Sequence, residues 1–146
     1  MFGPHLVLEG YECEAKNALS DKLAVTNLLA EFPQKLDMNI ILPPQVMYYD
    51  GGEIPEDNGV SGFVIIAESH IAVHTFAAKR FFTLDIFSCK PFEIEKAIKF
   101  IGDFFKPQYC EHKVFERGRE FPRSIGRAAH IVGSERAQLQ RELAEV

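Results

Sequence analysis

The stretch that decides the fold is Gly59-Val60-Ser61-Gly62-Phe63-Val64-Ile65-Ile66-Ala67-Glu68-Ser69-His70-Ile71-Ala72-Val73-His74-Thr75. An apolar run from Phe63 to Ala67 stops at three polar residues, Glu68, Ser69 and His70, and an alternating pattern then resumes. Runs of β-branched and aromatic residues bounded by glycine are typical of strands. The pattern therefore predicts a buried strand that is interrupted by an acid, a hydroxyl and an imidazole.

Two interpretations of this interruption stay open at the level of the residues. Burying such polar groups costs about 1–3 kcal/mol each unless they find partners, which favours a chemical role. The alternative is a plain turn between two strands, with Glu68, Ser69 and His70 in water. A serine next to a histidine is too short a motif to decide between them.

Outward from this stretch, apolar periodicity predicts alternating strands and helices. Strands are expected at His5–Tyr11, Asp37–Tyr49, Phe81–Cys89 and Gln108–Glu116. An amphipathic helix is expected from Asn17 to Phe32, with Ser20 or Asp21 as N-cap and Pro33 as its stop. A second helix is expected from Pro91, in its first turn, to Lys106, before Pro107.

These elements predict an α/β fold of the α+β two-layer sandwich type, in which two helices cover one face of an antiparallel sheet. The Pro43-Pro44 pair confines the strand at 37–49 to an edge or a bend. The other sheet face must be polar or covered, and a partner subunit would cover it, so we expect a homodimer. Length favours one domain over residues 1–146, with a peripheral tail from about Arg117 and a short charged helix at Ser134–Glu145.

Composition narrows the class of protein. The net charge of −5 argues against nucleic acid as a partner. Three cysteines without CxxC spacing fit neither a disulfide framework nor a zinc site, so no metal is expected. The chain shows no signal-peptide pattern and no apolar run near the roughly 20 residues that cross a bilayer. We expect a cytoplasmic protein with reduced thiols that does not bind membranes.

Several separated motifs together carry a resemblance. Glu68-Ser69-His70 is preceded by Gly59-Val60-Ser61-Gly62 and followed by His74-Thr75 and Cys89. With them stand the more distant motifs Gly3-x-His5-Leu6, Tyr11-Glu12-Cys13 and Glu116-Arg117-Gly118-Arg119. Over about residues 3 to 119 the sequence resembles the S-adenosylmethionine decarboxylase family in its small prokaryotic form.

The resemblance implies a cofactor made from the chain itself. Ser69 would attack the Glu68 carbonyl, and the chain would divide into residues 1–68 and 69–146, with a pyruvoyl group at Ser69. That group would form a Schiff base with the amine of a small amino-acid substrate and accept electrons as carbon dioxide leaves. The implied product is decarboxylated S-adenosylmethionine, the aminopropyl donor for spermidine.

The resemblance also implies roles for three further residues. His74 would assist self-cleavage, Ser61 would support it by hydrogen bonding, and Cys89 would protonate the carbanion after decarboxylation. A hairpin that turns at Ala77-Ala78-Lys79-Arg80 can bring such positions toward one end of the sheet. Taken alone, Cys89 is more often a buried small hydrophobe, and that is our expectation for Cys13 and Cys110.

The sequence departs from the family pattern at residues that the resemblance associates with substrate binding. Where the family commonly continues His-Thr-Trp-Pro-Glu, this chain has Phe76-Ala77-Ala78 after Thr75, and the sugar-binding acid is absent. An acid from the loop at 50–58 (Glu53, Glu56 or Asp57) would substitute, or the pocket takes another amino acid. A pyruvoyl-dependent arginine or ornithine decarboxylase is therefore the alternative, and a non-enzymatic binding domain is the third hypothesis.

Overall fold

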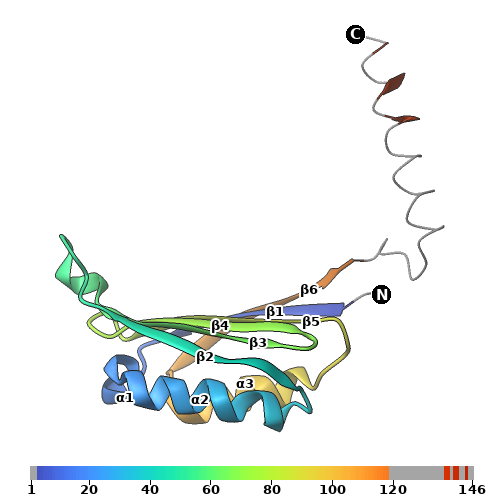
Figure 1. Ribbon diagram of the computed structural model, residues 1–146. Helices are drawn as coiled ribbons and strands as arrows, with labels where there is room; N and C mark the ends of the chain where they lie inside the picture. The colour runs from blue at the N-terminus through green and yellow to red at the C-terminus, as the bar shows by residue number, and fades with distance from the viewer. Residues whose placement is uncertain (1–2, 119–136, 139, 142–143, 145–146) are drawn as a thin grey trace.

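One antiparallel sheet with helices on a single face makes up the fold (Figure 1). The computed structural model describes residues 3–118, 137–138, 140–141 and 144. The six strands lie in the order β2-β3-β4-β5-β1-β6. Their bounds are β1 Gly3–Tyr11, β2 Ile40–Tyr49, β3 Gly59–Ile66, β4 Ser69–Phe76, β5 Phe81–Ser88 and β6 Tyr109–Arg117. The helices are α1 Lys16–Ser20, α2 Lys22–Lys35 and α3 Ile94–Phe105, with a short 3-10 turn at Pro55–Asp57. The predicted two-layer α+β class is confirmed.

The core lies between the sheet and the helices. Along the central strands, residues with even numbers in β3 and odd numbers in β4 are buried, as alternation requires. Phe82 of β5 stacks on Phe105 of α3, with 4.6 Å between the ring centroids. Phe32 of α2 stacks on Phe100 of α3 in the same way, at 5.0 Å. Phenylalanine rings thus join both long helices to each other and to the sheet.

The deciding stretch is a hairpin and not one interrupted strand. β3 ends at Ile66, Ala67 and Glu68 form the turn, and β4 begins at Ser69, which pairs with Ile66. Of the two open interpretations, the interrupted single strand was wrong and the turn between two strands is confirmed. A tight two-residue turn needs no glycine or proline to mark it. The next turn, at 77–80, lies where it was predicted, since Phe76 pairs with Phe81.

The helix boundaries differ from the prediction at three points. The first helix is split at Asp21, whose carboxylate caps α2 by accepting a hydrogen bond from the Ala24 N–H at 3.1 Å. Pro33 lies inside α2 and does not end it, because the Leu36 and Met38 N–H groups bond to its carbonyl and close the helix two residues later. Pro91 precedes α3, which begins only at Ile94.

The sheet has β2 at one edge and β6 at the other, and one of its faces carries no helix among the described residues (Figure 1). β2 is an edge strand, and its register shifts between Ile40 and Gln45, as the Pro43-Pro44 pair predicted. No helix covers the second face of the sheet in the described part of the chain (Figure 1). Exposed apolar side chains there include Met47, Phe63 and Phe115.

Among the described residues, no helix has the length and apolarity needed to span a membrane. The helix predicted at 134–145 falls mostly outside those residues.

Candidate active site

Ser69 has a backbone conformation that L-residues rarely adopt. Its φ is 153°, while its neighbours in β4 are ordinary strand residues paired with β5. Conformations of this kind cost about 1–3 kcal/mol and persist where the surroundings impose them. Here Ser69 is held between Ile66 of β3 and Ser88 of β5, so two ladders fix it. Ser69 is therefore strained at the first residue after the turn.

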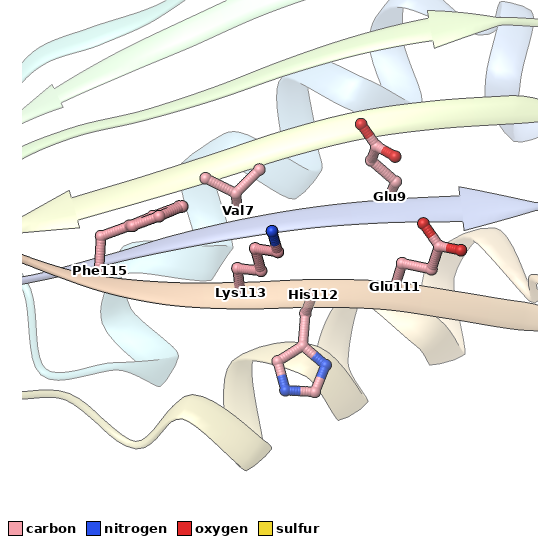
Figure 2. Close-up of a pocket in the computed structure, with 6 residues that line it drawn as sticks. All are labelled: Val7, Glu9, Glu111, His112, Lys113 and Phe115. Atoms are coloured by element: carbon pink, nitrogen blue, oxygen red, sulfur yellow. The ribbon is translucent and has the colours of Figure 1, made fainter.

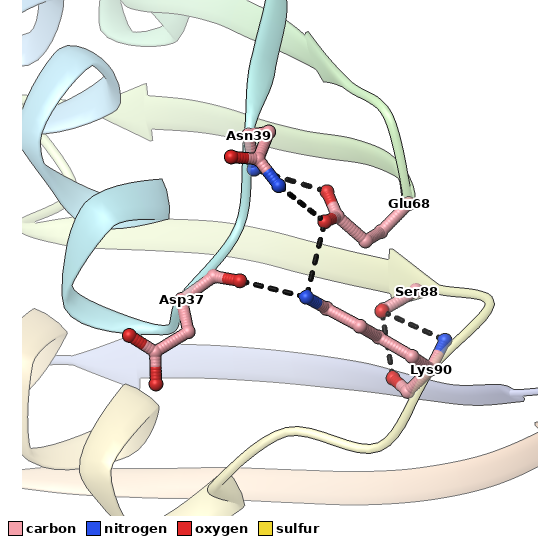
Figure 3. Close-up of polar contacts among 5 residues, drawn as sticks. All are labelled: Asp37, Asn39, Glu68, Ser88 and Lys90. Atoms are coloured by element: carbon pink, nitrogen blue, oxygen red, sulfur yellow. Dashed lines mark hydrogen bonds and ion pairs between the residues drawn. The ribbon is translucent and has the colours of Figure 1, made fainter.

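Glu68 is buried in the turn instead of pointing into water. Only 6% of the residue is exposed. Its carboxylate accepts hydrogen bonds from the Asn39 N–H at 3.1 Å and the Asn39 side-chain amide at 3.2 Å, and it pairs with Lys90 Nζ at 3.2 Å (Figure 3). Burial raises the pKa of the Glu68 carboxyl, but the bonds from Asn39 and Lys90 outweigh it, and the pKa is lowered. The plain solvated turn is thus excluded for this residue.

The carbonyl group that Ser69 would attack already has a donor. The Cys89 N–H donates to the Glu68 carbonyl oxygen at 2.7 Å. An amide aimed at such an oxygen stabilises the negative charge that develops there when a nucleophile adds. Gly3 of β1 keeps this backbone in place, because a Cβ at Gly3 would lie 1.8 Å from the Ser88 carbonyl oxygen. Only glycine allows β1 to approach the 88–89 backbone so closely.

Cys89 differs from the other two cysteines in its exposure. It is exposed beside the Glu68–Ser69 bond, whereas Cys13 is buried in the core and Cys110 is half-buried. Burial, reinforced by the neighbouring Cys110 thiol, raises the pKa of Cys13 to about 11, and burial also raises the pKa of Cys110. The expectation of a buried small hydrophobe fits Cys13, fits Cys110 only in part and does not fit Cys89.

Limited alkylation of the native protein should therefore modify Cys89 first. Thiolates react and thiols do not, so the raised pKa and the burial of Cys13 protect it at pH 8. We expect iodoacetamide to label Cys89 at least tenfold faster than Cys13, as measured by mass spectrometry of digests over time. Equal labelling of the three cysteines in the folded protein would contradict the placement of Cys89 at an accessible site.

His74 and Ser61 form a pair on the open face. Ser61 Oγ and His74 Nδ1 are 2.7 Å apart, on directly paired positions of β3 and β4. Ser69 stands five residues before His74 in the same strand. At about 3.3 Å per residue, that is roughly 16 Å. Within one chain, Cys89 is thus brought to the Glu68–Ser69 bond, and the Ser61–His74 pair is not.

A cluster on the open face was not predicted. His5 of β1 and His70 of β4 are both opposite Phe87 of β5, and their Nε2 atoms lie 3.1 and 3.0 Å from Asp85 Oδ2. The three are close enough together to hold a metal ion. Arg117, however, donates to His5 Nδ1 at 3.4 Å, so the His5 proton is on Nε2 and points at Asp85. We describe the cluster as a hydrogen-bonded His–Asp–His network. It fixes the imidazole ring of His70, the residue next to Ser69.

The acidic loop lies at the other end of the hairpin from Ser69. The Ala77 N–H donates to the Asn58 carbonyl, and the Asp57 carboxylate is paired with Lys79 at 2.5 Å. Glu53 and Glu56 are exposed. The loop therefore borders Phe76-Ala77-Ala78 and the His74 end of β4, and not the Glu68–Ser69 bond of its own chain.

A shallow hollow extends the open face over β1 and β6. Val7, Glu9, Glu111, Lys113 and Phe115 project into it, while His112 points to the other side of the sheet (Figure 2). Val7 pairs with Asp85, so the hollow begins beside the His–Asp–His network. The hollow is lined by acidic, basic and aromatic side chains, and it belongs to the same uncovered sheet face.

The fold and the Glu68–Ser69 turn define a class before any comparison: an antiparallel α+β domain with a strained serine directly after a buried glutamate. Residues 4–118 match the family model described as S-adenosylmethionine decarboxylase. The chain therefore belongs to the S-adenosylmethionine decarboxylase family, a family of carboxy-lyases.

Individual relatives agree with this assignment. The chain is 32% identical over 119 residues to the S-adenosylmethionine decarboxylase proenzyme of Pyrococcus horikoshii, covering 81% of this chain and 80% of that one. It is 31% identical over 117 residues to the proenzyme of Methanococcus aeolicus, covering 80% and 93%. The crystal structure of the Aquifex aeolicus adenosylmethionine decarboxylase has a TM-score of 0.68 at 21% identity, covering 84% of this chain and 96% of that one. This last likeness supports the fold alone.

Proposed function

We propose that the protein cleaves itself between Glu68 and Ser69 and then decarboxylates S-adenosylmethionine. The observation that carries the proposal is the strained Ser69, with φ of 153°, directly after a carbonyl that the Cys89 N–H already binds at 2.7 Å. The relatives with this name support the substrate, and they are named proenzymes, as a self-cleaving chain would be. They do not favour arginine or ornithine.

Self-cleavage starts with the Ser69 hydroxyl oxygen. It bonds to the Glu68 carbonyl carbon, the C–N bond of the peptide breaks, and the hydroxyl proton ends on the freed amine. The Cys89 N–H stabilises the oxyanion that forms on the way. A base then removes the α-proton of residue 69, a Cα=Cβ double bond forms, and the Cβ–O electron pair leaves with the Glu68 carboxylate. Water hydrolyses the resulting enamine and releases ammonia.

The residues present fit the pyruvoyl group that this sequence of steps leaves at position 69. Its keto carbon supplies an electrophile for a substrate amine and a sink for electrons. The thiol of the exposed Cys89 stands beside it and is the group that would deliver a proton there. His70, fixed by Asp85 at 3.0 Å, limits where the substrate can lie.

The Ser61–His74 pair would act on the Ser69 of a second chain. The pair is about 16 Å along β4 from its own Ser69, too far for any hydrogen bond. It is on the open face, which also carries exposed Phe63 and Met47. We infer a homodimer that packs open face on open face, so that each His74 approaches the Ser69 of its partner. The acidic loop at 50–58 would then border the partner's site.

Mixed dimers test this arrangement. Dimers that contain only Ser69→Ala should not be cleaved, because they lack the nucleophile. Dimers that contain only His74→Ala should not be cleaved either, because they lack the imidazole. When the two are co-expressed with different tags, the His74→Ala chain should be cleaved in the mixed dimer and the Ser69→Ala chain should stay intact. The mixed dimer is purified through both tags, and denaturing gels then show which of its two chains is cleaved. An uncut His74→Ala chain in that dimer would contradict a shared site, as would a monomeric mass by light scattering.

The substrate is tested with the purified, cleaved protein. We expect release of carbon dioxide from S-adenosylmethionine at a rate at least a hundredfold above that from arginine or ornithine. Borohydride reduction in the presence of substrate should link the substrate to the fragment that begins at residue 69. Preference for arginine or ornithine would overturn the substrate, and a cleaved protein that releases carbon dioxide from none of the three would overturn the activity.

A further inference from the structure

Glu68 carries a charge that the self-cleavage reaction must accommodate. The inference below rests on the proposed self-cleavage. The Glu68 side chain is already a buried carboxylate with its pKa lowered, so it is ionised at neutral pH. The elimination step expels the Glu68 main chain as a second carboxylate, a few bonds away on the same residue. Two like charges so close repel each other unless a cation lies nearby.

Lys90 is the cation that the fold places there. Among the described residues it alone forms an ion pair with Glu68, with Nζ 3.2 Å from Oε1 (Figure 3). The same Nζ donates to the Asp37 carbonyl at 2.7 Å, which fixes it between the α2–β2 connection and the hairpin turn. The Ser88 hydroxyl accepts from the Lys90 N–H at 3.2 Å and donates to the Lys90 carbonyl at 2.7 Å, which holds the backbone at this residue.

We propose that Lys90 is a positioning residue for self-cleavage: by neutralising the Glu68 side chain, it makes the Glu68 α-carboxylate a better leaving group. The effect is confined to the elimination step, in which that carboxylate is expelled. The earlier attack of Ser69 places its negative charge on the Glu68 carbonyl oxygen, which the Cys89 N–H binds. Turnover of substrate by the cleaved enzyme needs no further departure of Glu68.

The test follows the conversion of newly made precursor over time in the full-length chain. Lys90→Met should cleave at least tenfold more slowly and should accumulate as an ester that hydroxylamine splits between residues 68 and 69. Lys90→Arg should restore most of the rate, because it returns the charge. The double variant Lys90→Met with Glu68→Gln should also recover, because no buried charge is left to repel the leaving group. Lys99→Met, at an exposed lysine paired with Asp103, is the matched control.

The rescue separates the proposal from a loss of structure. A merely misfolded turn would not be restored by removing the Glu68 charge as well. The proposal is overturned if Lys90→Met cleaves at the wild-type rate, if it slows without ester accumulating, or if the double variant is as slow as Lys90→Met. A wild-type chain that never cleaves would instead defeat the proposed function itself, so the two failures are distinguishable.

Discussion

Replacing Ser69 with alanine should leave a single intact chain, whereas the wild type should separate into two fragments on a denaturing gel. Alanine has no hydroxyl, so neither the ester nor the double bond can form, and cleavage should be lost completely. Decarboxylation should fall to background with it, because no electrophile is made. Gel electrophoresis and carbon dioxide release measure the two effects.

A cysteine variant serves as the control for this prediction. Ser69→Cys keeps a nucleophile at the same strained position and should cleave slowly through a thioester. The electrophile must still form afterwards by elimination at residue 69. Circular dichroism should show that Ser69→Ala keeps its fold. If Ser69→Ala decarboxylated substrate at the wild-type rate, the catalytic group would have to lie elsewhere.

The second large effect concerns the separate tasks of Cys89 and His74. Cys89→Ala should still yield two fragments, because its role in cleavage is played by its backbone N–H, which alanine retains. Turnover should fall at least a hundredfold, or divert to protonation at the wrong atom with loss of the cofactor, because the thiol that delivers the proton is gone. Cleavage on gels and product analysis by mass spectrometry measure the two outcomes.

His74→Ala should show the opposite pattern. The His74 imidazole can accept a proton during self-cleavage, and the Ser61 hydroxyl 2.7 Å away orients its ring. The variant should stall as an intact chain or as the hydroxylamine-sensitive ester. If Cys89→Ala failed to mature while His74→Ala matured normally, the two roles would be assigned the wrong way round.

The sequence predicted the layers of this fold well because periodicity reports burial. Alternation along Phe81–Cys89 and the 3.6-residue stripe of α3 each reflect one face turned to the same core. The hairpin turn at 67–68 was only one of two open interpretations, because Ala67 and Glu68 are not typical turn-forming residues. The turn depends on Asn39, whose carbonyl accepts from the Ala67 N–H at 2.8 Å and whose N–H binds Glu68.

The site was predictable only as far as its residues are neighbours in sequence. Glu68, Ser69 and Cys89 were named from motifs, whereas Lys90 went unnoticed beside Cys89 because an ion pair with a turn residue needs the tertiary fold. The His5–Asp85–His70 network comes from three strands, and it follows only once Phe87 is known to face both histidines. That register was not available from spacing.

Self-cleavage between Glu68 and Ser69 is tested most directly by the intact mass of the purified wild-type protein under denaturing conditions. We expect two masses, one for residues 1–68 and one for residues 69–146, with the second lighter by one ammonia than a fragment that begins with serine. A single mass for the whole chain in a preparation that decarboxylates S-adenosylmethionine would contradict this expectation.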